Sequence, residues 1–169
     1  MAAVMNPTDL TEFNATGDYG LGLQLGYAGQ YLNFLSSQGT FEIDYTGGFD
    51  LSDDFFLGIN AAYFDGGDDD TSFAGAALYP QYATSDSFSL GLRAEYFAET
   101  GFFGAIGATD AEGDASVFAV TLTGNYTVGD LTIKPEIRLD SASEEAFIDN
   151  DLAGSKSLSS FVLAAVYSF

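Results

Sequence analysis

Residues 158–169 read LSSFVLAAVYSF, and their side chains alternate as they do in a β-strand. Successive side chains of a strand point to opposite faces of the sheet, so every second residue shares a face. The larger face contains Phe161, Leu163, Tyr167 and Phe169, whereas from Ser160 onward the other face holds only Ser, Val and Ala. A strand of about ten residues with one apolar face is the unit of a membrane-spanning β-barrel, and the alternative is the last strand of a soluble sandwich or barrel.

The same alternation recurs along most of the chain. Residues 1–17 show no such period, so we expect an N-terminal loop there and a single β-barrel domain over residues 18–169. Gly29 and Gln30 indicate either a tight turn or a bulge inside one long strand. The bulge gives eight strands, the even number that we expect, and ten strands is the alternative. The predicted strands cover residues 19–35, 40–51, 55–64, 73–83, 88–97, 118–126, 131–140 and 158–169.

The composition of the chain excludes several classes of function. Its 169 residues fit a single domain. It contains no Cys and no His, which removes disulfides, thiolate metal sites and Ser-His or Cys-His catalysis. The net charge of −21 argues against nucleic-acid binding, because phosphate contacts need Lys and Arg. We therefore expect no enzyme activity, no cofactor and no nucleic-acid partner, and no apolar run is long enough for a transmembrane helix.

The connections between the predicted strands alternate in length. Those near residues 52–54, 84–87 and 128–130 are short. Those near residues 65–72, 99–115 and 141–157 are longer and hold many of the acidic residues. Short turns on one rim and long loops on the other are typical of an outer-membrane barrel, whereas a soluble meander has no reason to sort its loops this way.

The size of the side chains indicates which face of each strand points outward. One face is crowded with Phe, Tyr, Leu and Ile, and the other is rich in Gly, Ala, Ser, Thr and Asn. A narrow barrel has little interior room, so we expect the small and polar side chains inside and the large ones in lipid. The aromatic side chains that we expect at the membrane interfaces are Tyr19, Tyr27, Tyr63, Tyr96, Tyr126, Tyr167 and Phe169.

Three of the four basic residues lie on the polar face of two predicted strands and alternate there with acids. These charges either line a permeation path and set its charge selectivity, or form an ion-pair plug in a filled barrel, which we favour for so short a chain. Glu95 and Glu136 are poor candidates for a glycosidase pair, because the nearby cations would hold both carboxylates ionised. The set comprises Arg93, Glu95, Lys134, Glu136, Arg138 and Asp140.

The run Asp68, Asp69 and Asp70 is a weak candidate for Ca²⁺ binding through oxygen ligands. It lacks the glycine and the glutamate that an EF-hand loop requires at fixed offsets. We favour a solvated acidic loop and expect no dedicated metal site.

The sequence from Leu92 to the C-terminus resembles the OmpL-like β-barrel porins. The resemblance rests on RAEYF at residues 93–97, KPEIRLD at residues 134–140, a Thr-rich strand that ends in Tyr126, and the closing YSF at residues 167–169. From residue 40 to the start of this C-terminal part, the resemblance is looser. Lys134 stands where the family leads us to expect Arg, which keeps the charge but loses the bidentate guanidinium. Members of the family are larger porins, so the shortness of this chain argues against a wide aqueous pore.

These observations predict an all-β, antiparallel transmembrane β-barrel in the outer membrane of a Gram-negative bacterium, in contact with its lipid. We expect porin-like, passive and at most narrow permeation of small solutes or ions. One alternative is a non-conducting structural or surface-interaction barrel whose acidic loops bind a partner, and another is a soluble ligand-binding β-barrel. A protein partner or a second copy would bind through the loops or the barrel wall.

Overall fold

The computed structural model of the protein describes residues 1–6, 17–67 and 70–169. Its regular structure consists of antiparallel strands, which confirms the all-β prediction. Among these residues, no helix has the length and apolarity that crossing a membrane requires. Residues 7–16 of the expected N-terminal loop lie outside the described part of the chain.

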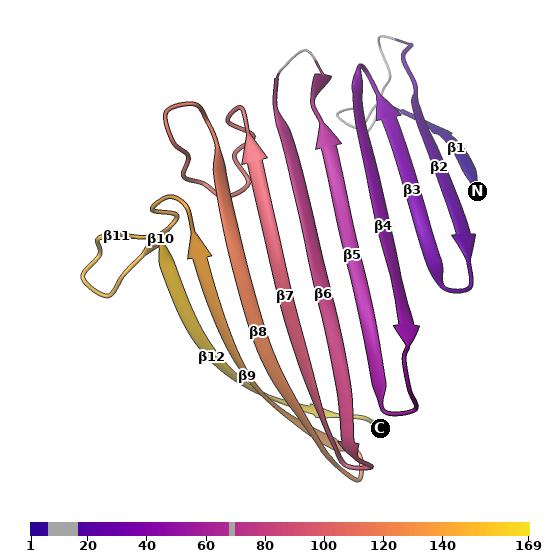
Figure 1. Ribbon diagram of the computed structural model, residues 1–169, viewed down its shortest axis with the longest axis vertical. Coiled ribbons are helices and arrows are strands. Elements are labelled where there is room, and N and C mark those ends of the chain that lie inside the picture. Colours follow the sequence, from indigo (N-terminus) through magenta and orange to yellow (C-terminus); the bar gives the residue numbers. More distant parts are fainter. Residues whose placement is uncertain (7–16, 68–69) are drawn as a thin grey trace.

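Ten strands form one sheet in the order β1-β2-β3-β4-β5-β6-β7-β8-β9-β12, so neighbours in the sequence are also neighbours in space (Figure 1). A separate pair, β10 and β11, lies in the last long loop. The strands are β1 (Ala2–Met5), β2 (Gly20–Tyr27), β3 (Gln30–Ser37), β4 (Thr40–Asp50), β5 (Phe55–Asp65), β6 (Ser72–Ser85), β7 (Phe88–Thr100), β8 (Ala115–Val128), β9 (Leu131–Ala142), β10 (Phe147–Ile148), β11 (Gly154–Ser155) and β12 (Ser157–Tyr167).

The main sheet has ten strands where we expected eight, and it is open rather than closed. A tight turn at Ala28 and Gly29 divides the expected long first strand into β2 and β3. Both residues have positive φ, 48° and 79°, which gives a two-residue hairpin whose twist matches that of the flanking strands. The other additional strand is β1, within the expected N-terminal loop. Because β1 and β12 end the sheet in the described part of the chain, the strand count of a closed barrel stays a prediction.

The connections are sorted between the two rims of the sheet as the sequence predicted. Turns at residues 28–29, 51–54, 86–87 and 129–130 lie at one rim, the lower one in Figure 1. The longer connections follow β5, β7 and β9, which all end at the opposite rim. A tight turn at residues 38–39 also lies there and departs from the pattern.

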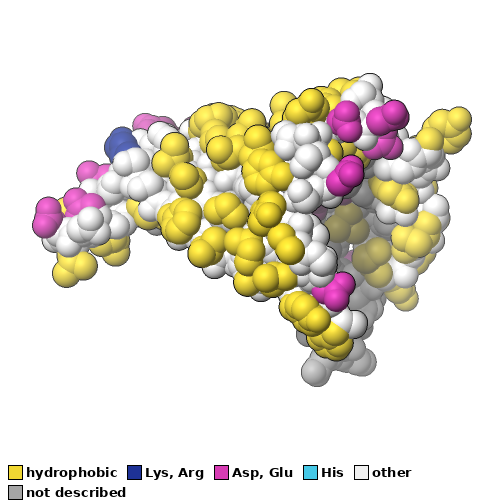
Figure 2. All heavy atoms as spheres, turned by 90° about the horizontal axis from the view of Figure 1, so that it is seen from below, with side chains coloured by type: hydrophobic (Ala, Val, Ile, Leu, Met, Phe, Trp, Pro, Cys, Tyr) yellow, Lys and Arg dark blue, Asp and Glu magenta, His cyan; other side chains and the backbone are white. Residues whose placement is uncertain are grey.

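The two faces of the sheet differ in the size of their side chains. On one face Leu92 pairs with Leu122, which pairs with Ile137, and Ile137 is 52% exposed. On the other face Ala119 and Thr121 are 4% and 8% exposed. Figure 2 shows apolar side chains gathered in a broad patch over the sheet. Leu92, Leu122 and Ile137 therefore share one face of the sheet, as the alternation predicted, and the contact of this face with lipid stays a prediction.

Exchanging residues of the 28–29 turn tests its geometry. A Cβ at Gly29 would meet no atom within 4 Å, so Gly29→Ala introduces only the strain of a positive φ. We expect this substitution to lower the free energy of unfolding by about 1 kcal/mol, and Ala28→Asn to raise it, because Asn tolerates the left-handed region. Urea unfolding in detergent micelles measures both changes. Gly91→Ala, in the open interior of β7, is the control. A Gly29→Ala protein more stable than the original would indicate a continuous strand.

Candidate functional site

The predicted charged residues all lie on the inner face, which we define as the face that carries Thr121. Arg93 on β7 and Arg138 on β9 both pair across from Thr121 of the intervening β8. Glu95 and Asp140 flank Ala119 in the same manner. Because the residues of β8 are small here, the long charged side chains of β7 and β9 extend over them. The period-two spacing places Glu95 on the same face as Arg93, and Asp140 on the same face as Arg138.

The charged side chains form two ion pairs, each between residues two apart on one strand. Arg138 binds Asp140 through Nε, 3.0 Å from Oδ1 and 2.9 Å from Oδ2, and through Nη2, 2.8 Å from Oδ1. The side chain of Asp140 is only 4% exposed, so this carboxylate depends on the guanidinium for its hydrogen bonds. Arg93 is paired with Glu95. The Nε of Arg93 is buried and has no hydrogen-bond partner within the described residues.

The remaining predicted residues are not joined to these pairs. Glu136 accepts a hydrogen bond from the hydroxyl of Thr123 at 2.7 Å. Lys134 has no ion pair within the ranges that the structure describes. The structure thus brings the predicted residues to one face but divides them into two ion pairs, one acid bound to a hydroxyl, and one cation.

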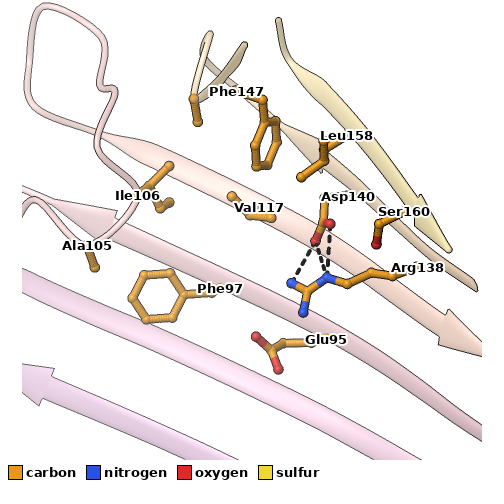
Figure 3. A pocket seen from close by; sticks show the side chains of 11 residues that line it. Glu95, Phe97, Ala105, Ile106, Val117, Arg138, Asp140, Phe147, Leu158 and Ser160 are labelled. Atoms are coloured by element: carbon orange, nitrogen blue, oxygen red, sulfur yellow. Dashed lines mark hydrogen bonds and ion pairs between the residues drawn. The ribbon is translucent and has the colours of Figure 1, made fainter. Parts of the chain in front are cut away.

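A cavity of about 320 Å³ lies beside the Arg138–Asp140 pair (Figure 3). Its polar side is formed by Glu95, Arg138 and Asp140, and the carboxylate of Glu95 faces the guanidinium of Arg138. Its apolar side is formed by Phe97, Ile106, Val117, Phe147 and Leu158. Ile106 and Phe147 belong to the long loops, so these loops fold over the inner face. The cavity could admit water, ions or small solutes between charged and apolar walls.

Glu99 anchors one of these loops and was missed by the sequence interpretation, which placed it in a loop. It lies near the end of β7, only 1% exposed, and accepts hydrogen bonds from the backbone N–H groups of Ala105 at 2.7 Å and Ile106 at 3.2 Å. Extending the alternation of Arg93, Glu95 and Phe97 by one step would have placed Glu99 on the inner face. A buried acid with two backbone donors holds the loop against the sheet.

An aromatic cluster also occupies the inner face, which we expected to hold mainly small side chains. Phe64 and Phe73 stack with ring centroids 5.3 Å apart, and Phe73 lies 5.5 Å from Phe97. Phe103, from the loop that Glu99 anchors, lies 5.6 Å from Phe64 and 5.1 Å from Phe73. Near the long-loop rim, aromatic packing therefore reinforces the position of this loop.

The other predicted site residues are the aromatic side chains of the membrane interfaces and the acidic run at residues 68–70. The expected interface aromatics are all exposed, which fits the predicted position but does not test contact with a membrane. Asp68 and Asp69 lie outside the described residues, so the weak Ca²⁺ site is untested. Within the described ranges, no group of three or more His, Cys, Asp or Glu side chains could hold a metal ion. The interface aromatics are Tyr19, Tyr27, Tyr63, Tyr96, Tyr126, Tyr167 and Phe169.

Removing the Glu99 anchor should release the loop. We expect Glu99→Ala to lower the free energy of unfolding by about 2 kcal/mol, because two charge-assisted hydrogen bonds are lost. Chymotrypsin should then cleave faster at Phe102 and Phe103, and Glu99→Gln, which keeps one carbonyl oxygen, should have an intermediate effect. Glu112→Ala, an exposed acid in the same loop, is the control. Equal cleavage of the Glu99→Ala and control proteins would show that Glu99 does not hold the loop.

The similarity of the sequence to known proteins indicates the family of this chain. No curated protein matches the sequence. The model of the family described as "Putative beta-barrel porin-2, OmpL-like" matches residues 1–169, the full length given. This match confirms the resemblance seen in the sequence and extends it to the N-terminal half. The chain therefore belongs to the OmpL-like β-barrel porin family.

Proposed function

We propose that the protein is an integral outer-membrane porin of a Gram-negative bacterium, which admits small ions or solutes passively along a narrow path and catalyses no reaction. The observation that carries this proposal is the division of one sheet into an exposed apolar face and an inner face with paired charges. Membership of a porin-like family supports it.

The outward face supports a location in lipid. Its rows of large side chains include Leu92, Ile137 and Leu163, which are 38%, 52% and 64% exposed. A contiguous exposed apolar surface of this kind marks a face that contacts a membrane or another protein. The transfer of apolar surface out of water is favourable by about 25 cal/mol per Å². A bilayer accepts such a surface without any protein partner.

The inner face supports permeation through the protein. Arg93 and Arg138 would be costly in hydrocarbon, whereas on a water-facing wall they can pair with Glu95 and Asp140 and remain hydrated. Both signs of charge therefore border the cavity through which a solute would pass. The chain as a whole carries a net charge of −21, so we propose that the path favours cations.

The closed ion pairs favour a second function, a non-conducting barrel in which they act as a plug. Arg138 and Asp140 satisfy one another directly, and Asp140 is buried. Such a protein would act as a structural anchor or would bind a partner through its acidic loops. Silence in electrical recordings would favour this function over permeation.

Conductance across planar bilayers tests the proposed path. We expect stable steps of small conductance and a reversal potential that indicates cation preference in a salt gradient. Arg138→Gln should increase this preference because it removes a positive charge from the cavity wall, and Glu95→Gln should reduce it. The matched control is Lys156→Gln, which removes the same charge from an exposed loop position paired with Glu144. Permeation through the cavity would be contradicted if the Lys156→Gln protein shifted as much as the Arg138→Gln protein.

A further inference from the structure

The cavity beside Arg138 is charged at one end and apolar at the other (Figure 3). Its lining comes from β7, β8, β9 and β12, which are neighbours in the main sheet, and from the loops of residues 101–114 and 143–156. The apolar end lies on the side of these loops, where Ile106 and Phe147 face Phe97. A cavity with two such ends suits a solute that has both a charged part and an apolar part.

The charged end keeps one donor and one acceptor that have no partner among the described residues. Arg138 binds Asp140 through Nε and Nη2, so that only Nη1 is left over. Arg93 binds Oε2 of Glu95, so that Oε1 of this carboxylate is left over. Within the described ranges no ion pair joins Glu95 to Arg138. Figure 3 shows the nitrogen of Arg138 that contacts no oxygen turned toward the Glu95 carboxylate. The two groups therefore present opposite charges across a gap.

These opposite charges determine which ionic solute the cavity favours. A solute with only a carboxylate is attracted by Arg138 and repelled by Glu95, and a solute with only an ammonium group meets the reverse. A solute with both groups can accept a hydrogen bond from Nη1 and donate one to Oε1. Charge-assisted hydrogen bonds of this kind are about twice as strong as neutral ones. The charged end therefore favours a zwitterion, which has no net charge for the acidic chain to repel.

The neighbouring ion pairs hold both free groups in position. Both carboxylate oxygens of Asp140 accept hydrogen bonds from Arg138, and this side chain is only 4% exposed. Asp140 therefore fixes the guanidinium and has no oxygen to spare for an ammonium group. Arg93 holds the carboxylate of Glu95 in the same way. Groups that are already ordered lose little conformational freedom when a solute binds, which favours affinity.

The apolar end and the size of the cavity determine the rest of the solute. Apolar side chains from the strands and from both loops line this end: Phe97, Ile106, Val117, Phe147 and Leu158. Burial of an apolar group against them is favourable by about 25 cal/mol per Å² removed from water. The volume of about 320 Å³ is near the lower limit for small-molecule sites. One amino acid therefore fits better than an oligomer.

We propose that this cavity binds a small zwitterion with an apolar side chain, that is, an apolar α-amino acid such as leucine. The carboxylate of the solute accepts from Arg138, its ammonium group donates to Glu95, and its side chain packs against Phe97 and Ile106. This inference deepens the proposed function and rests on its premise that water reaches the inner face. It gives the class of solute that the path holds during passage.

The binding of four related solutes to the protein in detergent micelles tests this site. Leucine carries both charges and an apolar side chain. Isocaproate lacks the ammonium group, isoamylamine lacks the carboxylate, and glycine lacks the side chain. Equilibrium dialysis with radiolabelled solutes gives the dissociation constants. We expect leucine to bind about tenfold more tightly than isocaproate or isoamylamine, because each of these lacks one hydrogen bond to a charged group. Glycine should also bind more weakly than leucine.

Two substitutions test the two ends of the cavity separately. Glu95→Gln keeps the shape of the side chain but removes its charge, so leucine should bind about tenfold more weakly and lose its advantage over isocaproate. Ile106→Ala should weaken the binding of leucine severalfold and leave the binding of glycine unchanged, because it shortens only the apolar wall. Glu112→Gln, which removes an exposed acid from the same loop as Ile106, is the control and should change neither affinity.

Equal affinities of leucine, isocaproate and isoamylamine, or no binding of leucine at all, would overturn the proposal. A Glu95→Gln protein with an unchanged circular dichroism spectrum and an unchanged preference for leucine over isocaproate would also overturn it. If that variant does not fold, Ile106→Ala decides, and an equal loss for leucine and glycine contradicts the site. Conductance distinguishes this proposal from the proposed function. Leucine binding without conductance supports the site and contradicts permeation, whereas conductance without leucine binding contradicts the site alone.

Discussion

The structure depends on the strict alternation of side chains between the two faces of one antiparallel sheet. This alternation sends large apolar side chains such as Leu122 and Ile137 to one face, while the charges of β7 and β9 stay on the other. A shift of one residue in any pairing would reverse both sets at once. The turns of the lower rim and the pairing of Leu92 with Leu122 keep the strands in one register. Each strand therefore contributes both to the exposed apolar face and to the inner face of the sheet.

The inner face is organised at two levels. Along the strands, each cation of β7 and β9 that forms an ion pair finds its acid two residues away, so the pairs need no contact between distant elements. Toward the long-loop rim, Glu99 and the aromatic cluster hold the loop of residues 101–114 against the wall. The cavity lies where these two regions meet, beside Arg138. The ion pairs on the strands and the loop that Glu99 holds therefore determine the position of the cavity.

The sequence predicted the features that repeat in every strand and missed those that depend on single residues. Alternation located the outward face and the charged set, because a period of two needs no tertiary information. The turn at Ala28 was ambiguous because alanine gives no signal for a positive φ. Glu99 was missed because the strand was ended too early. The open edges of β1 and β12 could not be predicted, since closure depends on the whole sheet and no local pattern encodes it.

A spin-label scan along β7 tests most directly whether the large side chains of the sheet face lipid. A single cysteine is placed in turn at each residue from Leu90 to Phe97, labelled and reconstituted into liposomes, and its accessibility to oxygen and to a water-soluble nickel chelate is measured. We expect the two accessibilities to alternate in opposite senses, with high oxygen accessibility at Leu90, Leu92 and Tyr96, and high nickel accessibility at Gly91, Arg93 and Glu95. Nickel accessibility that is highest at Leu92 and Tyr96, or equal along the strand, would contradict this expectation.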